Sequence, residues 1–294
     1  MGKWISILFC VFFTVMSCAA GITNEKLYRK AETHFNNREW NEAMMMYDVL
    51  LTENPTYLPL YVSSIIASSK IGASQSVMHY IELSEKNGVS LDSLFIGVER
   101  LARNMQDTPI YENMLILMKG EQPWLKKIIN GYLLRYYRFR NNYEEIVTIA
   151  DELLLTVPDN IAILKVKGEA LFMTGKEAES VDIYKKILEL DSQNTDASLF
   201  LGNYYYWKGS EALKALDRNF NDLTSPNRMQ YAVYKKEKDS ILDSDFSSAA
   251  YYLEKVSAKG MTPYVKQVLY DIYVQRSEVS KAEALKPKVR KRLL

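Results

Sequence analysis

Cysteine and histidine are almost missing from this chain of 294 residues. The two cysteines, Cys10 and Cys18, both lie within the first twenty residues, so the remainder has no thiol for a disulfide, a zinc site or nucleophilic catalysis. The two histidines, His34 and His79, have no second ligand at metal-binding spacing and are interpreted as structural or surface residues. Phosphate-binding, dinucleotide-binding, HExxH and GxSxG motifs are also absent. We therefore expect neither an enzyme nor a bound cofactor or metal.

Glycine and proline are scarce as well, at 12 and 8 residues. This scarcity disfavours an all-β or turn-rich fold and favours helices joined by short connections. The formal net charge is only +1, so no overall field attracts nucleic acid or an acidic substrate. Nucleic acid is therefore not an expected partner.

The first twenty residues differ from the rest of the chain. One lysine precedes an unbroken apolar run from Ile5 to Met16, and small residues follow it. The run is too short to span a bilayer comfortably as a permanent helix. Residues 1–20 are therefore predicted to be a secretory signal peptide, and the protein is expected to be exported.

Two kinds of cleavage fit the end of this segment. The small residues at 17–20 suit an ordinary signal peptidase, which would leave a soluble periplasmic protein. The stretch VMSC (15–18) resembles a bacterial lipoprotein box, although Met16 is unusual at its position. That resemblance implies that Cys18 becomes a lipid-bearing N-terminus and anchors the protein to a membrane of the cell envelope.

Three segments repeat at a spacing of 34 residues. They are LLRYYRFRN (133–141), KGEALFMTG (167–175) and LGNYYYWKG (201–209). In the last two, Gly168 aligns with Gly202 and Gly175 aligns with Gly209. Constant spacing of this kind predicts a structural repeat.

One period predicts two helices. In 161–194, a first helix with regularly spaced apolar residues is expected to end at Gly175. A second helix carries apolar residues three and four apart, and the polar stretch 191–194 stops it. Paired helices of this length form a hairpin that must cover its apolar face with a neighbouring hairpin.

The period resembles the tetratricopeptide repeat family. That family places a small and a bulky residue in the first helix, a small residue and an aromatic in the second, and often a proline in the turn. Here these positions hold Gly168, Leu171, Ser180, Tyr184 and Ser192, and the N-terminal repeat supplies Ala43, Tyr47 and Pro55. The resemblance implies an all-α, right-handed superhelical solenoid of stacked antiparallel hairpins.

The repeat frame divides the chain into five parts. These are the signal peptide (1–20), one N-terminal repeat-like hairpin (21–57), two degenerate hairpins (58–126), three repeat-like hairpins (127–228), and C-terminal degenerate hairpins with a basic tail (229–294). The polar stretch 219–229 is interpreted as an enlarged loop or a hinge. The final 14 residues carry six basic side chains against one acidic, which fits a solvated last helix or contact with anionic lipid or an acidic partner.

Residues 243–254 have acidic side chains at some of the spacings of a calcium loop. The glycine that such a loop needs for its sharp turn is replaced by Ser248. We therefore expect Ser244 or Asp245 to cap the N-terminus of a helix instead.

The family resemblance also implies a concave groove lined by the first helix of each repeat. The groove residues expected here are Arg135, Arg138, Phe139, Lys165, Glu169, Phe172, Asn203, Tyr206 and Trp207. Within LGNYYYWKG, the alignment places Tyr205 in the core, Tyr204 between repeats, and the next two aromatics in the groove. The alternative is that these aromatics only pack against the neighbouring helix.

These features favour a non-enzymatic scaffold or adaptor of the bacterial cell envelope. Rigid aromatics beside arginine and lysine suit capture of a protein or peptide segment in the groove. A glycan- or nutrient-uptake accessory protein is the alternative, in which Tyr206 and Trp207 would stack on sugars.

Overall fold

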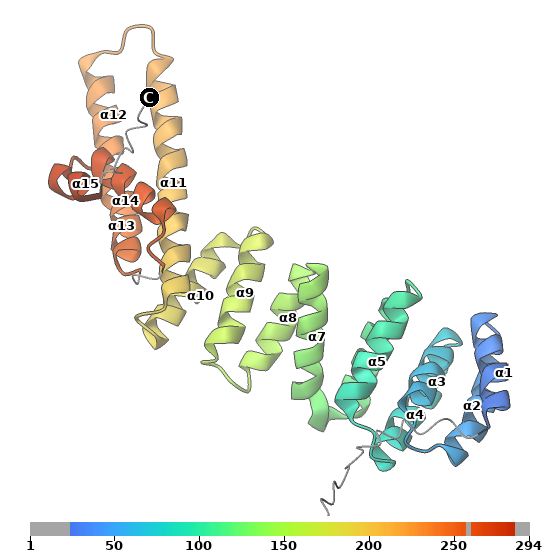
Figure 1. Cartoon of the computed structure of the whole chain (residues 1–294). Coiled ribbons are helices and arrows are strands. Elements are labelled where there is room, and N and C mark those ends of the chain that lie inside the picture. Colours follow the sequence, from blue (N-terminus) through green and yellow to red (C-terminus); the bar gives the residue numbers. More distant parts are fainter. Residues whose placement is uncertain (1–23, 257–259, 286–294) are drawn as a thin grey trace, which may run out of the picture. The chain divides into compact units, whose positions relative to one another are not determined.

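The computed structural model describes residues 24–256 and 260–285, so the predicted signal peptide, Cys18 and the tail at 286–294 lie outside it. Helices and turns make up the described residues, which contain no strand, as the sequence predicts. The chain forms two compact units, residues 1–129 and 130–294, which are described separately (Figure 1). None of the helices within the described ranges combines the length and the apolar character needed to cross a membrane.

Unit 1 contains three helical hairpins. They are α1 (Glu25–Asn36) with α2 (Trp40–Glu53), α3 (Leu58–Lys70) with α4 (Ser74–Lys86), and α5 (Leu91–Asn104) with α6 (Pro109–Glu121). The short 3₁₀ helix η1 (Pro123–Leu125) follows, and α7 (Lys126–Arg140) crosses into unit 2. Two hairpins therefore occupy 58–126, where the family residues are missing from the sequence.

Tyrosine fills much of the core of unit 1. Tyr47 and Tyr80 are almost fully buried. Each keeps a hydrogen bond, because the hydroxyl of Tyr47 donates to Glu32 (2.6 Å) and that of Tyr80 donates to Asp48 (2.6 Å). Buried phenols need such partners, so the aromatic core also joins neighbouring helices through polar contacts.

The turns inside the hairpins share one backbone conformation, which recurs with the period of the repeat. A residue with positive φ follows the first helix of five successive hairpins, at Arg38, Gly72, Gln106, Asn141 and Gly175. The separations are 34 or 35 residues. At each turn the following amide donates back to the end of the helix, as in the Schellman motif. The period thus continues through hairpins that carry no family signature.

Unit 2 continues from α7 with a longer series of helices. They are α8 (Tyr143–Leu154), α9 (Ile161–Met173), α10 (Glu177–Leu190), α11 (Thr195–Asn221), α12 (Arg228–Ile241), the π-helix η2 (Leu242–Phe246), α13 (Ser247–Glu254), α14 (Pro263–Gln275) and α15 (Val279–Leu285). Asn160 and Asn194 cap α9 and α11 by accepting the amides of Ile163 and Ala197.

The small residue predicted at Gly168 brings α9 and α10 together. A Cβ at this position would lie 2.9 Å from Cε2 of Tyr184, which is closer than real contacts allow. The Ser180 hydroxyl also donates to the carbonyl of Gly168 at 2.8 Å. Gly168 is therefore the small residue that lets the two helices of this hairpin approach closely.

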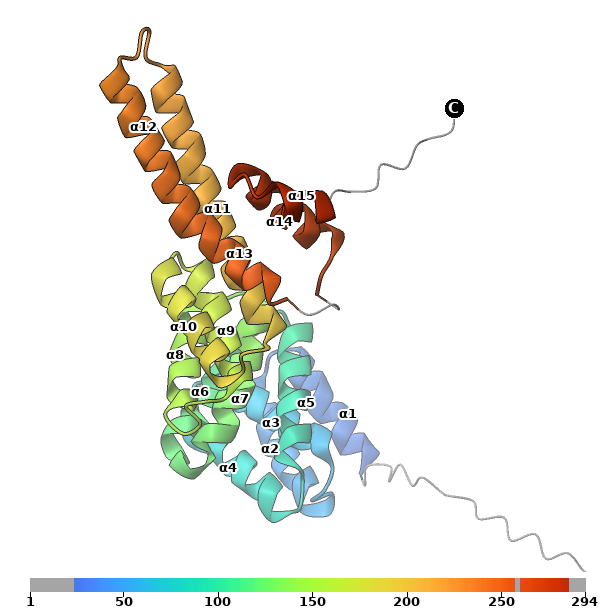
Figure 2. The same cartoon turned by 90° about the vertical axis from the view of Figure 1, so that its left-hand side faces the viewer.

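The hairpin expected within 195–228 is wrong in extent. Helix α11 continues through Gly209 to Asn221, and its partner is the continuous helix α12–η2–α13, which runs beside it (Figures 1 and 2). Gly209 does not have the positive φ of Gly175. A Cβ there would meet Asp245 Cβ and the Phe246 ring at 3.0 Å, so this glycine permits close helix packing and does not end a helix.

The cap predicted at Ser244 or Asp245 is also wrong. Both residues lie in the π-helix between α12 and α13, where no helix begins. Asp245 is buried and contacts the Lys208 ammonium at 2.9 Å. The Leu242 carbonyl accepts the amide of Ser247 across the π turn, and it also accepts from Ser247 Oγ (3.2 Å) and Arg276 (3.4 Å).

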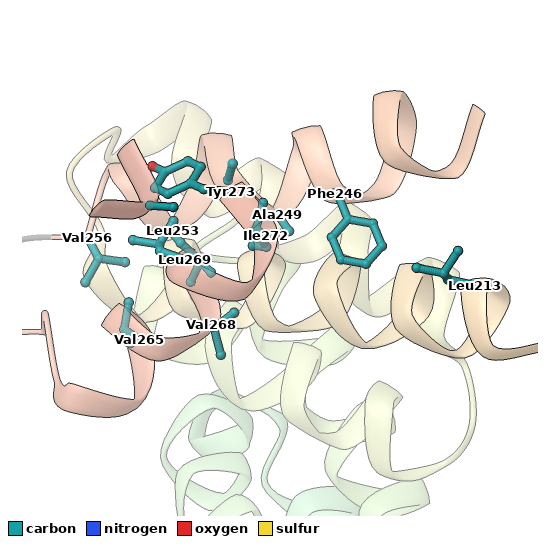
Figure 3. Close-up of a cluster of buried hydrophobic side chains, with 12 residues drawn as sticks. Leu213, Phe246, Ala249, Leu253, Val256, Val265, Val268, Leu269, Ile272 and Tyr273 are labelled. Carbon is teal, nitrogen blue, oxygen red and sulfur yellow. The ribbon is translucent and has the colours of Figure 1, made fainter. Parts of the chain in front are cut away.

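The C-terminal helices cover the lower part of this long hairpin. Figure 3 shows Leu213 of α11, Phe246 of η2 and Leu253 of α13 in one cluster with side chains of α14. Leu253 and Ile272 have no exposed surface. The cluster ties α11, α13 and α14 into one body within unit 2 and positions the candidate site described next.

Candidate functional site: an aromatic groove in unit 2

A hollow of about 490 Å³ lies along α11 in unit 2. We call it the aromatic groove. Its lining residues are Phe172, Phe200, Asn203, Tyr204, Tyr206, Trp207, Ser210, Glu211, Lys214 and Tyr264. Helix α9 contributes Phe172, α14 contributes Tyr264, and α11 contributes the others.

The continuation of α11 beyond Gly209 builds one side of the groove. Asn203, Trp207, Ser210 and Lys214 follow each other at spacings of three and four residues, which places them along one helix face. A turn at Gly209 would have removed the last two from this row. The extra helical length therefore enlarges the site.

Stacked rings form the back of the groove. Phe200 stacks on the buried ring of Tyr184, with centroids 3.8 Å apart, and meets Phe172 edge to face at 5.4 Å. Tyr204 lies parallel to Phe200 at 6.5 Å. Because Tyr184 belongs to the core of the α9–α10 hairpin, these contacts hold the lining rings in place.

Tyr206 connects the groove to the C-terminal helices. Its ring meets Phe246 edge to face at 6.0 Å, and its hydroxyl donates to Asp271 at 3.4 Å. Burial, followed by the negative charge of Asp271, raises the pKa of Tyr206 above its ordinary value. This tyrosine therefore lines the groove and also holds α14 against α11.

Other rings at the groove face solvent. Trp207 is 53% exposed, Tyr264 is 60% exposed and Phe172 is 38% exposed. Large apolar side chains gathered around a hollow characterise a surface that a ligand covers. The groove thus has a back wall of packed aromatic rings and further aromatic rings at its rim that are exposed to solvent.

The polar groups of the groove are few. The Oδ1 atom of Asn203 is buried and has no hydrogen-bond partner among the described residues. A ligand that donates an N–H or O–H group would satisfy it. Glu211 and Lys214 form an ion pair at 2.9 Å and offset each other's charge. The groove is therefore suited to a largely uncharged segment.

The structure brings together four of the nine residues predicted for the groove: Phe172, Asn203, Tyr206 and Trp207. Lys165 of α9 instead forms an ion pair with Asp196 of α11. That pair links adjacent helices within unit 2.

The remaining predicted residues lie elsewhere. Arg138 and Glu169 line a separate hollow of about 190 Å³ between α7, α8 and α9. The guanidinium of Arg135 lies over the ring of Tyr132, with 5.0 Å from Cζ to the ring centroid. Phe139 is 75% exposed. These residues line no part of the aromatic groove.

Sequence reasoning missed six lining residues: Phe200, Tyr204, Ser210, Glu211, Lys214 and Tyr264. Tyr204 was expected between repeats, and it stacks on Phe200 as well as lining the groove. Tyr205, expected in the core, is half-buried and stacks on Tyr252 at 5.9 Å. The helical spacing after Gly209 could have revealed the residues of α11, but no local pattern connects Tyr264 to them.

Comparisons with known proteins support the fold. No protein-family model matches the chain, and no curated protein matches it. A crystal structure of a candidate protein binding protein from Bacteroides ovatus is 23% identical, covers 76% of this chain and 99% of its own, and has a TM-score of 0.56.

Two repeat proteins are similar at lower scores. The C-terminal part of a TPR repeat-containing protein from Cytophaga hutchinsonii is 12% identical, with 88% of this chain and 92% of its own covered and a TM-score of 0.40. A TPR repeats protein from Bacteroides fragilis is 17% identical, with coverages of 86% and 99% and a TM-score of 0.34. The Bacteroides ovatus structure and the repeated hairpins together give this chain an all-α fold of successive helical hairpins.

Proposed function

We propose that this protein is a non-enzymatic interaction scaffold of the bacterial cell envelope, and that its aromatic groove binds a segment of a partner protein. The observation that carries the proposal is the set of half-exposed rings around a hollow with a fixed aromatic wall. Rigid aromatics supply most of the binding energy in many protein interfaces, because they bury a large area at low entropic cost. The solenoid of the tetratricopeptide type supports this assignment by fold only.

The polar groups of the groove indicate what kind of segment fits. The rings would cover an apolar or aromatic anchor side chain. Asn203 Oδ1 would accept a hydrogen bond from a main-chain amide beside that anchor. Because Glu211 and Lys214 pair with each other, no net charge selects a charged terminus.

Replacing Trp207 by alanine should weaken partner binding at least tenfold while leaving the fold intact. The ring is 53% exposed and lines the groove, so its loss removes contact area without opening the core. The partner is first identified by crosslinking the tagged protein in its native cells. Calorimetry with the purified partner then measures the change in Kd, and circular dichroism measures Tm.

Trp124→Ala is the matched control, because Trp124 is 74% exposed, lies in η1 of unit 1 and is not among the residues that line the groove. This variant should bind like the wild type. Equal partner binding by Trp207→Ala and the wild type would refute the proposed site. Tyr206 is a poorer probe, since its contacts with Phe246 and Asp271 couple binding to stability.

A glycan ligand is the second candidate, and the exposed rings of Trp207 and Tyr264 favour it. Flat aromatic faces can stack on sugar rings, and Asn203 Oδ1 could accept a sugar hydroxyl. A glycan array probed with the wild type and Trp207→Ala distinguishes the two ligands. A tryptophan-dependent glycan signal, without a crosslinked protein, would replace the peptide assignment.

Attachment to the cell envelope follows from the proposed signal peptide and from lipidation of Cys18. Cys18→Ser should move the exported protein from the membrane fraction to the soluble periplasmic fraction, because the acyl chains supply the anchor. Immunoblotting of the fractions measures this shift. An unmodified mature N-terminus at Ala20 or Gly21, seen by mass spectrometry, would remove the lipid anchor from the proposal.

A further inference from the structure

The end of the long hairpin has no role in the groove. Residues 218–238, the hairpin tip, contain the last turn of α11, the connection at 222–227 and most of α12. Figures 1 and 2 show that the tip extends beyond α14 and α15. Helix α12 has no buried side chain. It is therefore paired with α11 but otherwise open.

Local contacts hold the tip in a defined conformation. Asn227 and Gln230 form a capping box at the start of α12. Phe220 of α11 stacks on Tyr234 of α12, with centroids 4.3 Å apart, and the Tyr234 hydroxyl donates to Asp217 at 2.8 Å. The exposed side chains of the tip are thus presented by an ordered pair of helices.

Apolar side chains at the tip remain open to solvent. Met229 is 78% exposed, Tyr231 is 56% exposed and Val233 is 51% exposed. Met229 and Val233 are four residues apart and lie on the same side of α12. Leu223 in the connection adds a fourth apolar group, at 38% exposure.

Positive charge is concentrated in the same place. Residues 218–238 hold five of the 37 basic and two of the 36 acidic residues. This leaves 32 basic against 34 acidic residues in the rest of the chain. Arg228, Lys235 and Lys236 are exposed and form no ion pair with the described residues. A basic, partly apolar tip therefore belongs to a protein whose remaining charges nearly balance.

We propose that the hairpin tip docks on a lipid bilayer that carries anionic head groups. Met229 and Val233 would enter the interfacial region, Tyr231 would lie at its edge, and the three cations would contact phosphates. This combination of a small apolar group and surrounding cations suits a bilayer better than a second copy of the chain. A symmetric dimer through the tip would bring like charges together.

A fluorescent probe can test which part of the chain reaches the bilayer. In the full chain with Cys10 and Cys18 replaced by serine, Val233→Cys is labelled with a polarity-sensitive dye. Phosphatidylcholine vesicles containing phosphatidylglycerol should shift its emission to the blue, and pure phosphatidylcholine vesicles should not. Val49→Cys is the matched control, because Val49 is 49% exposed on α2 and also follows an exposed methionine, Met45, by four residues. No shift at position 233 would overturn the proposal.

Substitutions separate the tip from the basic tail. R228Q/K235Q/K236Q should reduce partitioning onto anionic vesicles on the order of 100-fold, at about 1 kcal/mol for each basic residue near the surface. M229S/V233S should reduce it about tenfold, and Met45→Ser/Val49→Ser should not change it. Vesicle sedimentation measures the partitioning at constant salt.

Two further outcomes would overturn the assignment. If both tip variants partition onto anionic vesicles as the wild type does, membrane binding belongs to the basic tail at 286–294 and not to the tip. Dimerisation that is lost in M229S/V233S, measured by analytical ultracentrifugation without vesicles, would assign the apolar side of α12 to a second copy. Trp207→Ala should bind vesicles normally, so the result is independent of the proposed groove.

Discussion

Replacing Gly202 by valine should lower the free energy of unfolding of unit 2 by about 3 kcal/mol, the upper end of the range for overpacking a core. A Cβ at position 202 would lie 2.5 Å from Cγ and Cδ2 of Leu253 and 3.3 Å from its amide nitrogen. Leu253 has no exposed surface and belongs to the cluster that joins α11, α13 and α14. It therefore cannot move aside without disturbing that core.

Gly131→Ala is the control for this substitution. Gly131 lies within α7 in the same unit, and a Cβ added there meets nothing within 4 Å. Removing a helical glycine should stabilise the unit by up to about 1 kcal/mol. Urea denaturation followed by circular dichroism measures both changes. If the urea midpoint of Gly202→Val equals that of the wild type, the close packing of α11 against α13 is contradicted.

Alkaline pH should destabilise both units as the pH rises above about 10. Burial raises the pKa of Tyr47, Tyr80, Tyr184 and Tyr273 above the ordinary value of 10. Neighbouring carboxylates raise it further in each case. Two of these tyrosines lie in each unit.

The direction of the pH effect follows from linkage. The unfolded chain loses these phenol protons near pH 10, whereas the folded chain keeps them, so stability is complete below pH 10 and falls above it. At about pH 11, each of these tyrosines lowers the free energy of unfolding by about 1.4 kcal/mol. With two such tyrosines in each part of the protein, unit 1 and unit 2 each lose about 3 kcal/mol. That is a large part of the stability of a small domain. Urea denaturation at increasing pH measures the loss.

Tyr80→Phe and Tyr184→Phe should each reduce the alkaline loss in one unit, because a titrating phenol is removed. Tyr80→Phe leaves Asp48, which is exposed, in contact with water. Tyr231→Phe, at an exposed position of the tip, is the control and should leave the pH profile unchanged. A wild-type free energy of unfolding that stays constant up to about pH 11 would contradict the burial assigned to these tyrosines.

The candidate site was only partly accessible to sequence reasoning. The alignment of LGNYYYWKG with the preceding repeat, together with the family resemblance, predicted Asn203, Tyr206 and Trp207 for one groove, and the structure brings these three residues together around a hollow. It could not place Tyr264, which follows the residues at 257–259 and reaches the groove through the packing of α14. It also could not show that Lys165 would form an ion pair with Asp196. Lysine and aspartate side chains can be solvated separately or can pair, and the sequence does not distinguish the two arrangements.

The sequence by itself determined the helical class and the period of this protein, because both follow from regularly spaced apolar residues and from small residues such as Gly168, which meets Tyr184 closely. It did not determine what each glycine does. Gly175 adopts positive φ and ends a helix, whereas Gly209, one period later, continues one. The difference arises from Asp245 and Phe246, which pack within 3.0 Å of the position of a Cβ at Gly209. Only the tertiary structure brings those residues to α11, and with them come the long hairpin, its exposed tip and the full length of the groove.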